Sequence, residues 1–306
     1  MEKVTFGKTG LQVSRLGFGA APIGYLQTER QRAAQIVDLL LASGVNFIDT
    51  AASYPGSEAA LGDILAGRRD KVVIVSKCGS TLADVPGAGW SAQVVSGTVD
   101  RSLRNLKTDH LDVMLLHSCD LQTLKKGEAL GALVKARESG KIRFVGYSGD
   151  NEAAAYAATL PDVAVIETSV SVADQANLRL VLPAARKNNI GIIAKRPVAN
   201  AAWREPEQQQ GLYRNYAQTY HDRLKQMKLN PADLGFSGAD AWPELALRFT
   251  LSHTGVHTAI IGTTNPDNAK ANIAYANKGP LPPDVVKKIE DAFNSADPNH
   301  MWTGQT

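Results

Sequence analysis

The 306-residue chain has few cysteines, no long apolar run and no excess of charge of one sign. Its two cysteines, Cys78 and Cys119, are too few for a disulfide-rich secreted scaffold and give no CxxC metal spacing. The apolar runs are far shorter than the ~20 residues of a membrane-spanning helix. Lys and Arg total 33 against 30 Asp and Glu, and this balance argues against a nucleic-acid surface.

Two further absences concern targeting and cofactor motifs. The N-terminal segment MEKVTFGKTG lacks the apolar core of a signal peptide, so we expect a cytoplasmic protein with neither a membrane nor a nucleic-acid partner. A GxGxxG fingerprint is also missing, because the segment GFGAAPIG carries Pro22 where the third glycine belongs.

What the chain does contain is a series of short apolar segments separated by helical ones. Eight of these segments are predicted strands, at 14–19, 45–49, 71–77, 111–117, 142–148, 163–167, 191–195 and 258–262. They lack the polar alternation of a half-exposed sheet, which indicates a parallel sheet covered by helices. Eight βα units favour a (β/α)8 TIM barrel forming one domain over 1–306, with an open doubly wound sheet as the competitor.

Three segments add detail to this prediction. Residues 3–20 are expected to form an N-terminal β-hairpin with its turn at Gly7–Gly10. Residues 123–140 are expected to be helical and to end at Gly140. The segment between predicted strands seven and eight exceeds a normal crossover, so we expect a long loop with an extra helix that shapes a substrate pocket.

Six predicted strands finish on a polar or ionisable residue, namely Asp49, Lys77, His117, Ser148, Glu167 and Lys195. The carboxyl ends of barrel strands meet at one mouth, where barrel active sites lie. Tyr54 follows the second predicted strand in the small-residue segment AASYPGSEAALG. The sequence therefore predicts that these side chains gather at one end of the barrel.

Asp49, Tyr54, Lys77 and His117 together suit general acid–base chemistry. A phenol has an ordinary pKa near ~10, and a neighbouring ammonium lowers it by favouring the phenolate. Asp49 would hold Lys77 in place and keep it charged, while His117 would donate a hydrogen bond to a substrate oxygen. Such a set can protonate a carbonyl oxygen or deprotonate an alcohol. A charged lysine is a poor nucleophile, which argues against a Schiff-base aldolase.

Six segments in this order resemble the aldo-keto reductases over nearly the whole chain. They are FGKTGLQVSRLGFGA, GVNFIDTAASYPGSEAALG, VVIVSKCG, VDRSLRNLKTDHLDVMLLH, GKIRFVGYS and IIGTTNPDNAKANI. The catalytic tetrad of that family falls on Asp49, Tyr54, Lys77 and His117. The resemblance implies a (β/α)8 barrel without a metal that transfers hydride between a nicotinamide cofactor and an aldehyde, ketone or sugar carbonyl. In that reaction Tyr54 would be the proton donor.

The resemblance also implies that NADP(H) or NAD(H) lies at the mouth. The residues implied to contact it are Gly19, Ala20, Asp49, Ser148, Glu167, Lys195, Arg196, Gly262, Thr263, Thr264, Asn268 and Asn272. Ser148 would bind the carboxamide, but Gly149 follows it where the family often has Asn. Glu167 stands where Gln is common, and an ionised carboxylate only accepts hydrogen bonds. Lys195 replaces a frequent stacking aromatic, and with Arg196 it is expected either to contact the pyrophosphate or to form salt bridges.

The segment IIGTTNPDNAKAN bears on the choice of cofactor. Relatives that prefer NADPH often place Arg or Lys here to bind the 2′-phosphate, whereas this chain offers hydroxyls and amides. Lys270 is the one cation of the segment. The sequence therefore predicts a weakened preference for NADPH, with NADH use or dual use.

The substrate itself is not identified by the sequence. Tyr54, Trp90, His117 and Trp302 are the expected pocket residues, although Trp90 and Trp302 could equally belong to a surface loop and a loosely packed terminus. An NAD-dependent sugar or polyol dehydrogenase would use the same tetrad as a carbonyl reductase. A non-catalytic regulatory subunit that binds cofactor is a third possible function. The sequence does not indicate the oligomeric state.

Overall fold

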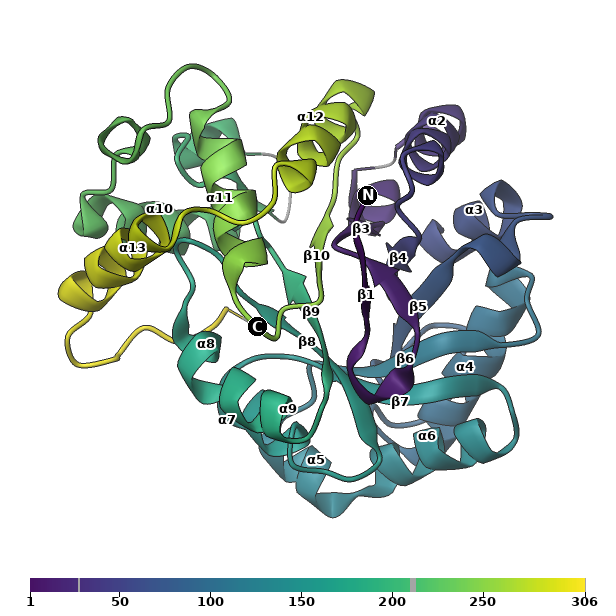
Figure 1. Ribbon diagram of the computed structural model, residues 1–306. Coiled ribbons are helices and arrows are strands. Elements are labelled where there is room, and N and C mark those ends of the chain that lie inside the picture. The colour runs from purple at the N-terminus through teal and green to yellow at the C-terminus, as the bar shows by residue number, and fades with distance from the viewer. Residues whose placement is uncertain (27, 210–212, 306) are drawn as a thin grey trace.

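The computed structural model describes residues 1–26, 28–209 and 213–305, and its centre is a closed parallel barrel (Figure 1). The barrel strands, in order around the barrel, are β3 (Leu16–Gly19), β4 (Phe47–Asp49), β5 (Val73–Cys78), β6 (Leu111–His117), β7 (Ile142–Ser148), β8 (Val163–Ser169), β9 (Gly191–Lys195) and β10 (Thr258–Ile261). The closing pair is β10 with β3, in parallel register. The predicted (β/α)8 barrel is therefore confirmed, and the open sheet is excluded.

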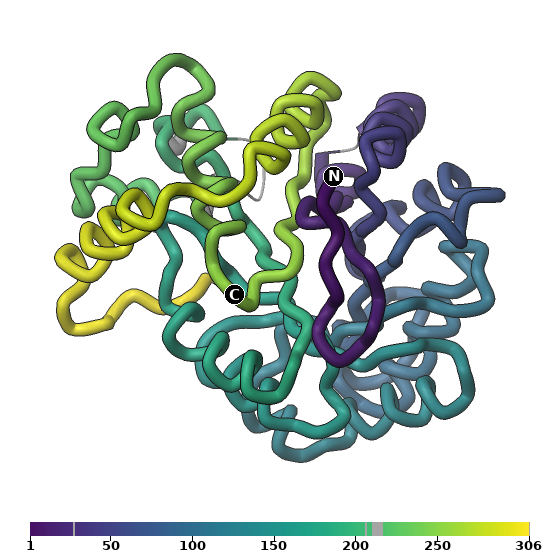
Figure 2. Tube along the Cα trace, in the orientation of Figure 1, coloured from purple at the N-terminus to yellow at the C-terminus, as the bar shows by residue number. Residues whose placement is uncertain are grey.

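The N-terminal hairpin is confirmed as a separate two-stranded sheet of β1 (Lys3–Thr5) and β2 (Gln12–Ser14). A short 3₁₀ turn at Gly7–Thr9 joins the two strands. Gly7 has a φ of 52°, and a Cβ there would lie 2.4 Å from the backbone nitrogen of Gly191, at the start of β9. The hairpin thus covers the amino end of the barrel, where Figure 2 shows it crossing in front of the strands.

Helices surround the barrel strands. They are α1 (Ala21–Tyr25), α2 (Arg30–Ala42), α3 (Ser57–Ile64), α4 (Ala92–Leu106), α5 (Leu121–Lys126), α6 (Glu128–Glu138), α7 (Asn151–Ala157), α8 (Ala176–Leu180), α9 (Leu182–Lys187), α10 (Tyr213–Met227), α11 (Ala241–Ser252), α12 (Pro266–Asn277) and α13 (Pro283–Ala296). Ser91 caps α4 by accepting a hydrogen bond from the Val94 nitrogen. Gly44 follows α2 with a φ of 83°, as expected of a helix stop.

The helix predicted within residues 123–140 is in fact divided. Gly127 has a φ of 75°, a left-handed conformation that ends α5 and begins α6. An α-helix cannot continue through that conformation, so the helical pattern on either side does not join. The predicted stop at Gly140, which has a φ of 77°, is present.

The long segment between β9 and β10 carries α10 and α11 in its described part. Buried side chains of α10, α11 and α13 form a second apolar cluster beside the barrel, including Tyr220, Leu224, Phe249, Ile289 and Phe293. The predicted long loop with an extra helix is therefore confirmed. In the described ranges, no helix is both long and apolar enough to cross a membrane.

Candidate active site

The barrel interior explains why the charged residues meet. Phe47, Val75, Leu115, Val165 and Ile193 point inward and form a buried apolar cluster with hairpin residues. Side chains two positions apart on a strand lie on the same face. The next inward residue of each of these strands is Asp49, Lys77, His117, Glu167 and Lys195 in turn. The polar layer thus stands directly above the apolar one, at the carboxyl end of the barrel.

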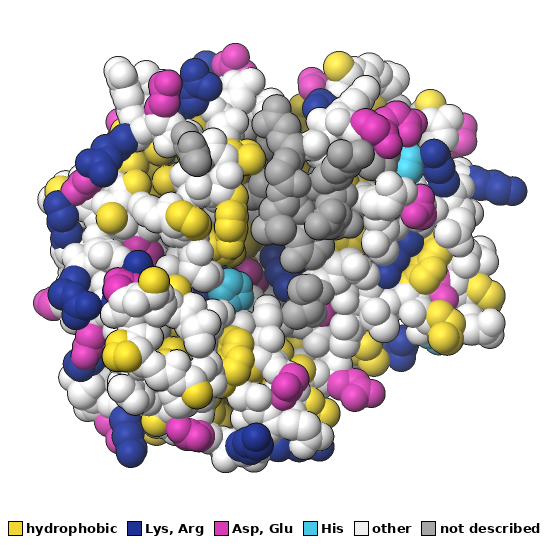
Figure 3. Space-filling view, turned by 180° about the vertical axis from the view of Figure 1, so that it is seen from behind, with side chains coloured by type: hydrophobic (Ala, Val, Ile, Leu, Met, Phe, Trp, Pro, Cys, Tyr) yellow, Lys and Arg dark blue, Asp and Glu magenta, His cyan; other side chains and the backbone are white. Residues whose placement is uncertain are grey.

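Figure 3 shows the face opposite the hairpin, where a histidine and charged side chains gather near the centre. Within the barrel mouth, Asp49 and Lys77 are both buried, with 2% and 1% of their surface exposed. The Lys77 Nζ donates to both carboxylate oxygens of Asp49, at 2.5 and 2.7 Å, and to the Thr50 carbonyl at 3.0 Å. Burial alone would lower the pKa of Lys77, but Asp49 and Glu167 raise it above its ordinary value. Lys77 is therefore a firmly charged ammonium, as the sequence predicted.

Tyr54 lies against this ammonium. The Lys77 Nζ is 5.4 Å from the centre of the Tyr54 ring, and the His117 ring meets Tyr54 edge-on at 6.0 Å. Tyr25 contacts the ring as well, at 5.3 Å. The structure thus brings Asp49, Tyr54, Lys77 and His117 together.

The pKa of Tyr54 differs from the sequence-based expectation. Burial raises it above its ordinary value, and this effect outweighs the lowering by Lys77. Asp49 and Glu167 raise it further, because their negative charges disfavour a phenolate. The protonated phenol is therefore the resting form of Tyr54, which suits a proton donor.

His117 is neutral. Burial, followed by the charge of Lys77, lowers the pKa of His117 to about 3. Its Nδ1 lies 3.4 Å from the Ser53 hydroxyl oxygen. If Ser53 donates to Nδ1, the ring proton is on Nε2, which leaves an N–H donor for a substrate oxygen.

Most residues expected to contact a cofactor lie at or near the carboxyl ends of barrel strands, whereas Asn268 and Asn272 lie on α12. Ser148 and Glu167 are neighbours in the pairing of β7 with β8. Gly19 and Gly262 approach closely, since a Cβ on Gly262 would lie 3.0 Å from the Gly19 carbonyl oxygen. The Ala20 nitrogen donates to the Asp49 carbonyl at 2.8 Å, which ties the end of β3 to β4.

Lys195 and Arg196 both have protein partners. The Lys195 Nζ pairs with the Asp150 carboxylate at 3.0 Å, and both side chains are largely buried. Asp150 also accepts hydrogen bonds from Ser169 and Asn177. Arg196 donates to the Gln305 carbonyl near the C-terminus. Contact of Lys195 or Arg196 with a pyrophosphate remains a prediction.

Sequence reasoning did not anticipate the role of Asp150. The signal for it was available, since Asp150 follows the end of β7 by two residues and therefore belongs to the same rim as Lys195. The ion pair between Glu167 and Lys77 was also missed, although both residues were predicted to lie at the barrel mouth.

The segment after β10 leads into α12. Asn265 caps the helix by accepting from the Asp267 nitrogen, and Thr263 accepts from the Asn265 nitrogen. Lys270 is exposed and pairs with Asp267 at 3.2 Å. Asn272 donates to the Asn268 carbonyl one turn back. The one cation of the segment is thus held beside a carboxylate of its own helix.

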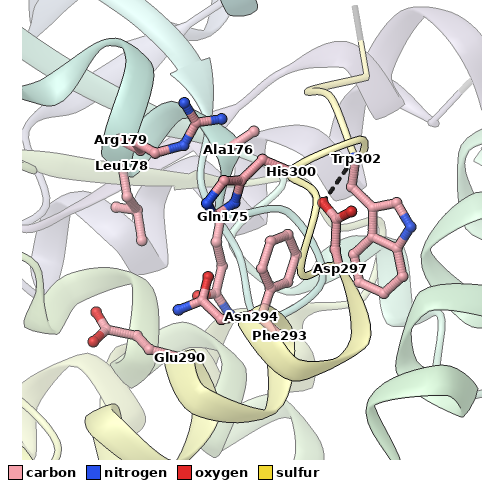
Figure 4. Close-up of a pocket in the computed structure, with 10 residues that line it drawn as sticks. All are labelled: Gln175, Ala176, Leu178, Arg179, Glu290, Phe293, Asn294, Asp297, His300 and Trp302. Atoms are coloured by element: carbon pink, nitrogen blue, oxygen red, sulfur yellow. Dashed lines mark hydrogen bonds between the residues drawn. The ribbon is translucent and has the colours of Figure 1, made fainter.

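The two tryptophans expected in the substrate pocket occupy different surroundings. The Trp90 ring covers Gly79, since a Cβ on Gly79 would lie 2.0 Å from that ring, and Gly79 is two residues beyond Lys77. Trp302 packs edge-on against Phe293 at 5.1 Å and lies 5.3 Å from the Arg223 guanidinium. It lines a cavity of about 380 Å³ between α8 and α13 (Figure 4). Asp297 accepts from the Trp302 nitrogen there.

Both cysteines are buried, in agreement with a packing role. Burial raises the pKa of Cys78 and Cys119 above the ordinary range, so neither is activated as a thiolate. Within the described ranges, no cluster of three His, Cys, Asp or Glu side chains could hold a metal ion.

Comparison with known proteins identifies the family. The model of the Aldo/keto reductase family matches residues 15–294. An uncharacterized oxidoreductase of Bacillus subtilis (strain 168) is 26% identical over 95% of this chain and 96% of its own length. The L-galactose dehydrogenase of Arabidopsis thaliana is 25% identical over 90% of this chain and 88% of its own.

Solved structures agree with this result. The holo form of an aldo-keto reductase from Bacillus halodurans superposes with a TM-score of 0.81, at 26% identity, covering 95% of this chain and 96% of that one. The match to the family model extends over nearly the whole barrel. The chain therefore belongs to the Aldo/keto reductase family and is an oxidoreductase that uses NADP(H) or NAD(H).

Proposed function

We propose that this enzyme reduces an aldehyde or ketone to an alcohol, with Tyr54 as the proton donor. The observation that carries the proposal is the contact of the Tyr54 ring with both the Lys77 ammonium and the neutral His117. The reduced nicotinamide, when bound, supplies the hydride. The Tyr54 hydroxyl gives its proton to the carbonyl oxygen, and the nearby ammonium stabilises the phenolate that results.

His117 orients the carbonyl in this proposal. Its low pKa, about 3, keeps the ring neutral throughout the physiological range, so it donates a hydrogen bond without competing as an acid. Lys77 acts by its charge, and Asp49 fixes the position of that charge through two short hydrogen bonds.

The residues at the mouth fit a nicotinamide carboxamide. The Glu167 Oε2 is buried and has no hydrogen-bond partner in the described part of the chain. A carboxamide N–H2 is a donor that would satisfy it, with Ser148 as the neighbouring polar group. We assign Ser148 and Glu167 to the carboxamide, and Gly262, Thr263, Thr264, Asn268 and Asn272 to the adenosine end.

We expect NADH and NADPH to give similar saturation constants, or NADH to be preferred. Lys270 is paired with Asp267, and a 2′-phosphate gains little from a cation already neutralised on its own helix. Initial rates with each cofactor over a range of concentrations measure this. Thr264→Arg should lower the KM for NADPH and leave that for NADH nearly unchanged, while Lys270→Gln should change neither. A strong preference of the wild type for NADPH would contradict the assignment.

The first experiment follows the absorbance of reduced nicotinamide. Each cofactor is tested with aromatic aldehydes, methylglyoxal and ketones, and NAD or NADP is tested with sugars in the reverse direction. Turnover of a carbonyl that disappears in Tyr54→Phe supports the proposal. Tight cofactor binding without turnover of any carbonyl or alcohol would instead favour a regulatory role.

NAD-dependent oxidation of a sugar or polyol is the second candidate. It would use the same four residues in the opposite direction. Lys270, the one cation in residues 262–272, is paired with Asp267. This pairing favours NAD-dependent oxidation, because NAD carries no 2′-phosphate for a cation to bind. Faster turnover of sugars with NAD than of any carbonyl with reduced cofactor would make this the principal activity.

A further inference from the structure

The Lys77 ammonium is shared between two carboxylates. Its three N–H donors are directed to the two oxygens of Asp49 and to the Thr50 carbonyl. Glu167 Oε2 nevertheless lies 3.2 Å from the same nitrogen. Glu167 thus feels the charge of Lys77 but receives no hydrogen bond from it.

Glu167 is enclosed by charged or titratable groups from neighbouring elements. These groups are Asp49 of β4, Tyr54 of the loop after β4, Lys77 of β5, His117 of β6 and Lys195 of β9, whose own partner is Asp150. The side chain of Glu167 is 4% exposed, so water screens these interactions poorly. A charge at this position therefore acts on all of them.

We propose that Glu167 is a positioning residue that acts on Tyr54 through Lys77. As a second carboxylate on that ammonium, it weakens the stabilisation that Lys77 gives to a Tyr54 phenolate and so keeps Tyr54 in its proton-donating form to higher pH. This inference rests on the proposed role of Tyr54, and it adds that the charge of Glu167 sets the pH range over which reduction proceeds.

The charges around the site support this role. Glu167 raises the pKa of Tyr54, after burial and together with Asp49, while Lys77 lowers it. Although burial alone would raise the pKa of Glu167, Lys77 and Lys195 hold it below its ordinary value, so Glu167 remains ionised. Burial and then the Glu167 charge raise the pKa of Asp49. An ionised Glu167 beside a single ammonium is thus a persistent negative charge near the phenol.

Glu167→Gln separates this role from cofactor binding. Glutamine has nearly the same shape and still offers a carbonyl oxygen to a carboxamide, while it removes the charge and replaces the second oxygen by an NH2 group. Without that charge Lys77 stabilises the phenolate more fully. The alkaline limb of kcat/KM for reduction is then expected to move to lower pH by roughly one unit, while the KM for the cofactor changes little.

A spectroscopic titration reports the same event without turnover. The tyrosinate absorbance of each protein is measured from neutral pH upward and compared with that of its Tyr54→Phe counterpart, so that the difference isolates Tyr54. Tyr54 is expected to ionise at lower pH in Glu167→Gln than in the wild type, each compared with its own Tyr54→Phe counterpart. Glu167→Asp keeps the charge and should restore a wild-type profile.

Glu58→Gln serves as the matched control. Glu58 is also buried, but it accepts from Ser76, which faces the opposite side of β5 from Lys77. Its pH profile should match the wild type. The inference is overturned if Tyr54 ionises at the same pH in the wild type and in Glu167→Gln. It is also overturned if Tyr54 ionises in neither protein before that protein unfolds. Full turnover of Tyr54→Phe would instead refute the proposed function, so the two failures are distinguishable.

Discussion

Tyr54→Phe is expected to lower kcat/KM for carbonyl reduction by roughly 10²–10⁴-fold, the range that a positioned general acid contributes. The substitution removes only the hydroxyl, because the phenyl ring can keep its edge contacts with Tyr25 and His117. Cofactor binding, measured by quenching of tryptophan fluorescence, should be retained. The loss should therefore appear in the chemical step and not in the KM for the cofactor.

Tyr156→Phe provides the comparison. Tyr156 lies on α7, with its ring 5.9 Å from the Lys125 ammonium, away from the barrel interior. It should behave as the wild type. Retention of more than about a tenth of the wild-type kcat/KM in Tyr54→Phe would show that another group, or water, donates the proton.

Lys77→Met is expected to impair both activity and folding. It leaves Asp49 and Glu167 buried beside each other without their ammonium, and breaking a buried ion pair in this way costs about 3–5 kcal/mol of unfolding free energy. Activity should fall at least as far as in Tyr54→Phe, since the phenolate loses its nearest positive charge. Urea denaturation measures the stability and steady-state rates measure the activity.

The stability defect of Lys77→Met should depend on pH. Without the ammonium, burial raises the pKa of both carboxyls in the folded state above their unfolded values. Such groups are protonated in both states at acid pH and impose little cost there. As pH rises through the unfolded-state values, near ~4, the unfolded chain ionises first and folding becomes less favourable. The difference from the wild type should therefore be small near pH ~4 and largest at neutral pH.

A second substitution checks this explanation. Adding Asp49→Asn to Lys77→Met removes one of the two stranded carboxylates and should recover part of the lost stability at neutral pH. If the double variant is no more stable than Lys77→Met, the defect comes from lost packing of the lysine side chain and not from uncompensated charge.

Much of the barrel could be predicted from local sequence. Continuous β-branched segments predicted every barrel strand, because a strand buried on both faces needs no polar alternation. The polar residue at the end of six of the eight segments predicted the composition of the mouth, because alternate side chains on a strand share a face. Asp49, Lys77 and His117 meet for that reason.

Interactions between distant residues were not predictable in the same way. Nothing local to Glu167 indicates that it competes with Asp49 for Lys77, since the competition depends on distances across the barrel. The raised pKa of Tyr54 likewise follows from burial, which a sequence does not display. The break at Gly127 depends on a backbone angle that flanking helix formers conceal.

The seam between β3 and β10 has a consequence for how the chain reaches its fold. Leu16 pairs with Ala259, and Arg15 donates to the carbonyls of Leu251, Val256 and His257 across the same seam. During synthesis β3 therefore cannot form this pair until β10 has been made, and until then one edge of β3 has no β10 partner. Without β10 the other seven strands could form only an open sheet with two unpaired edges, and the pairing of β10 with β3 and β9 removes both edges.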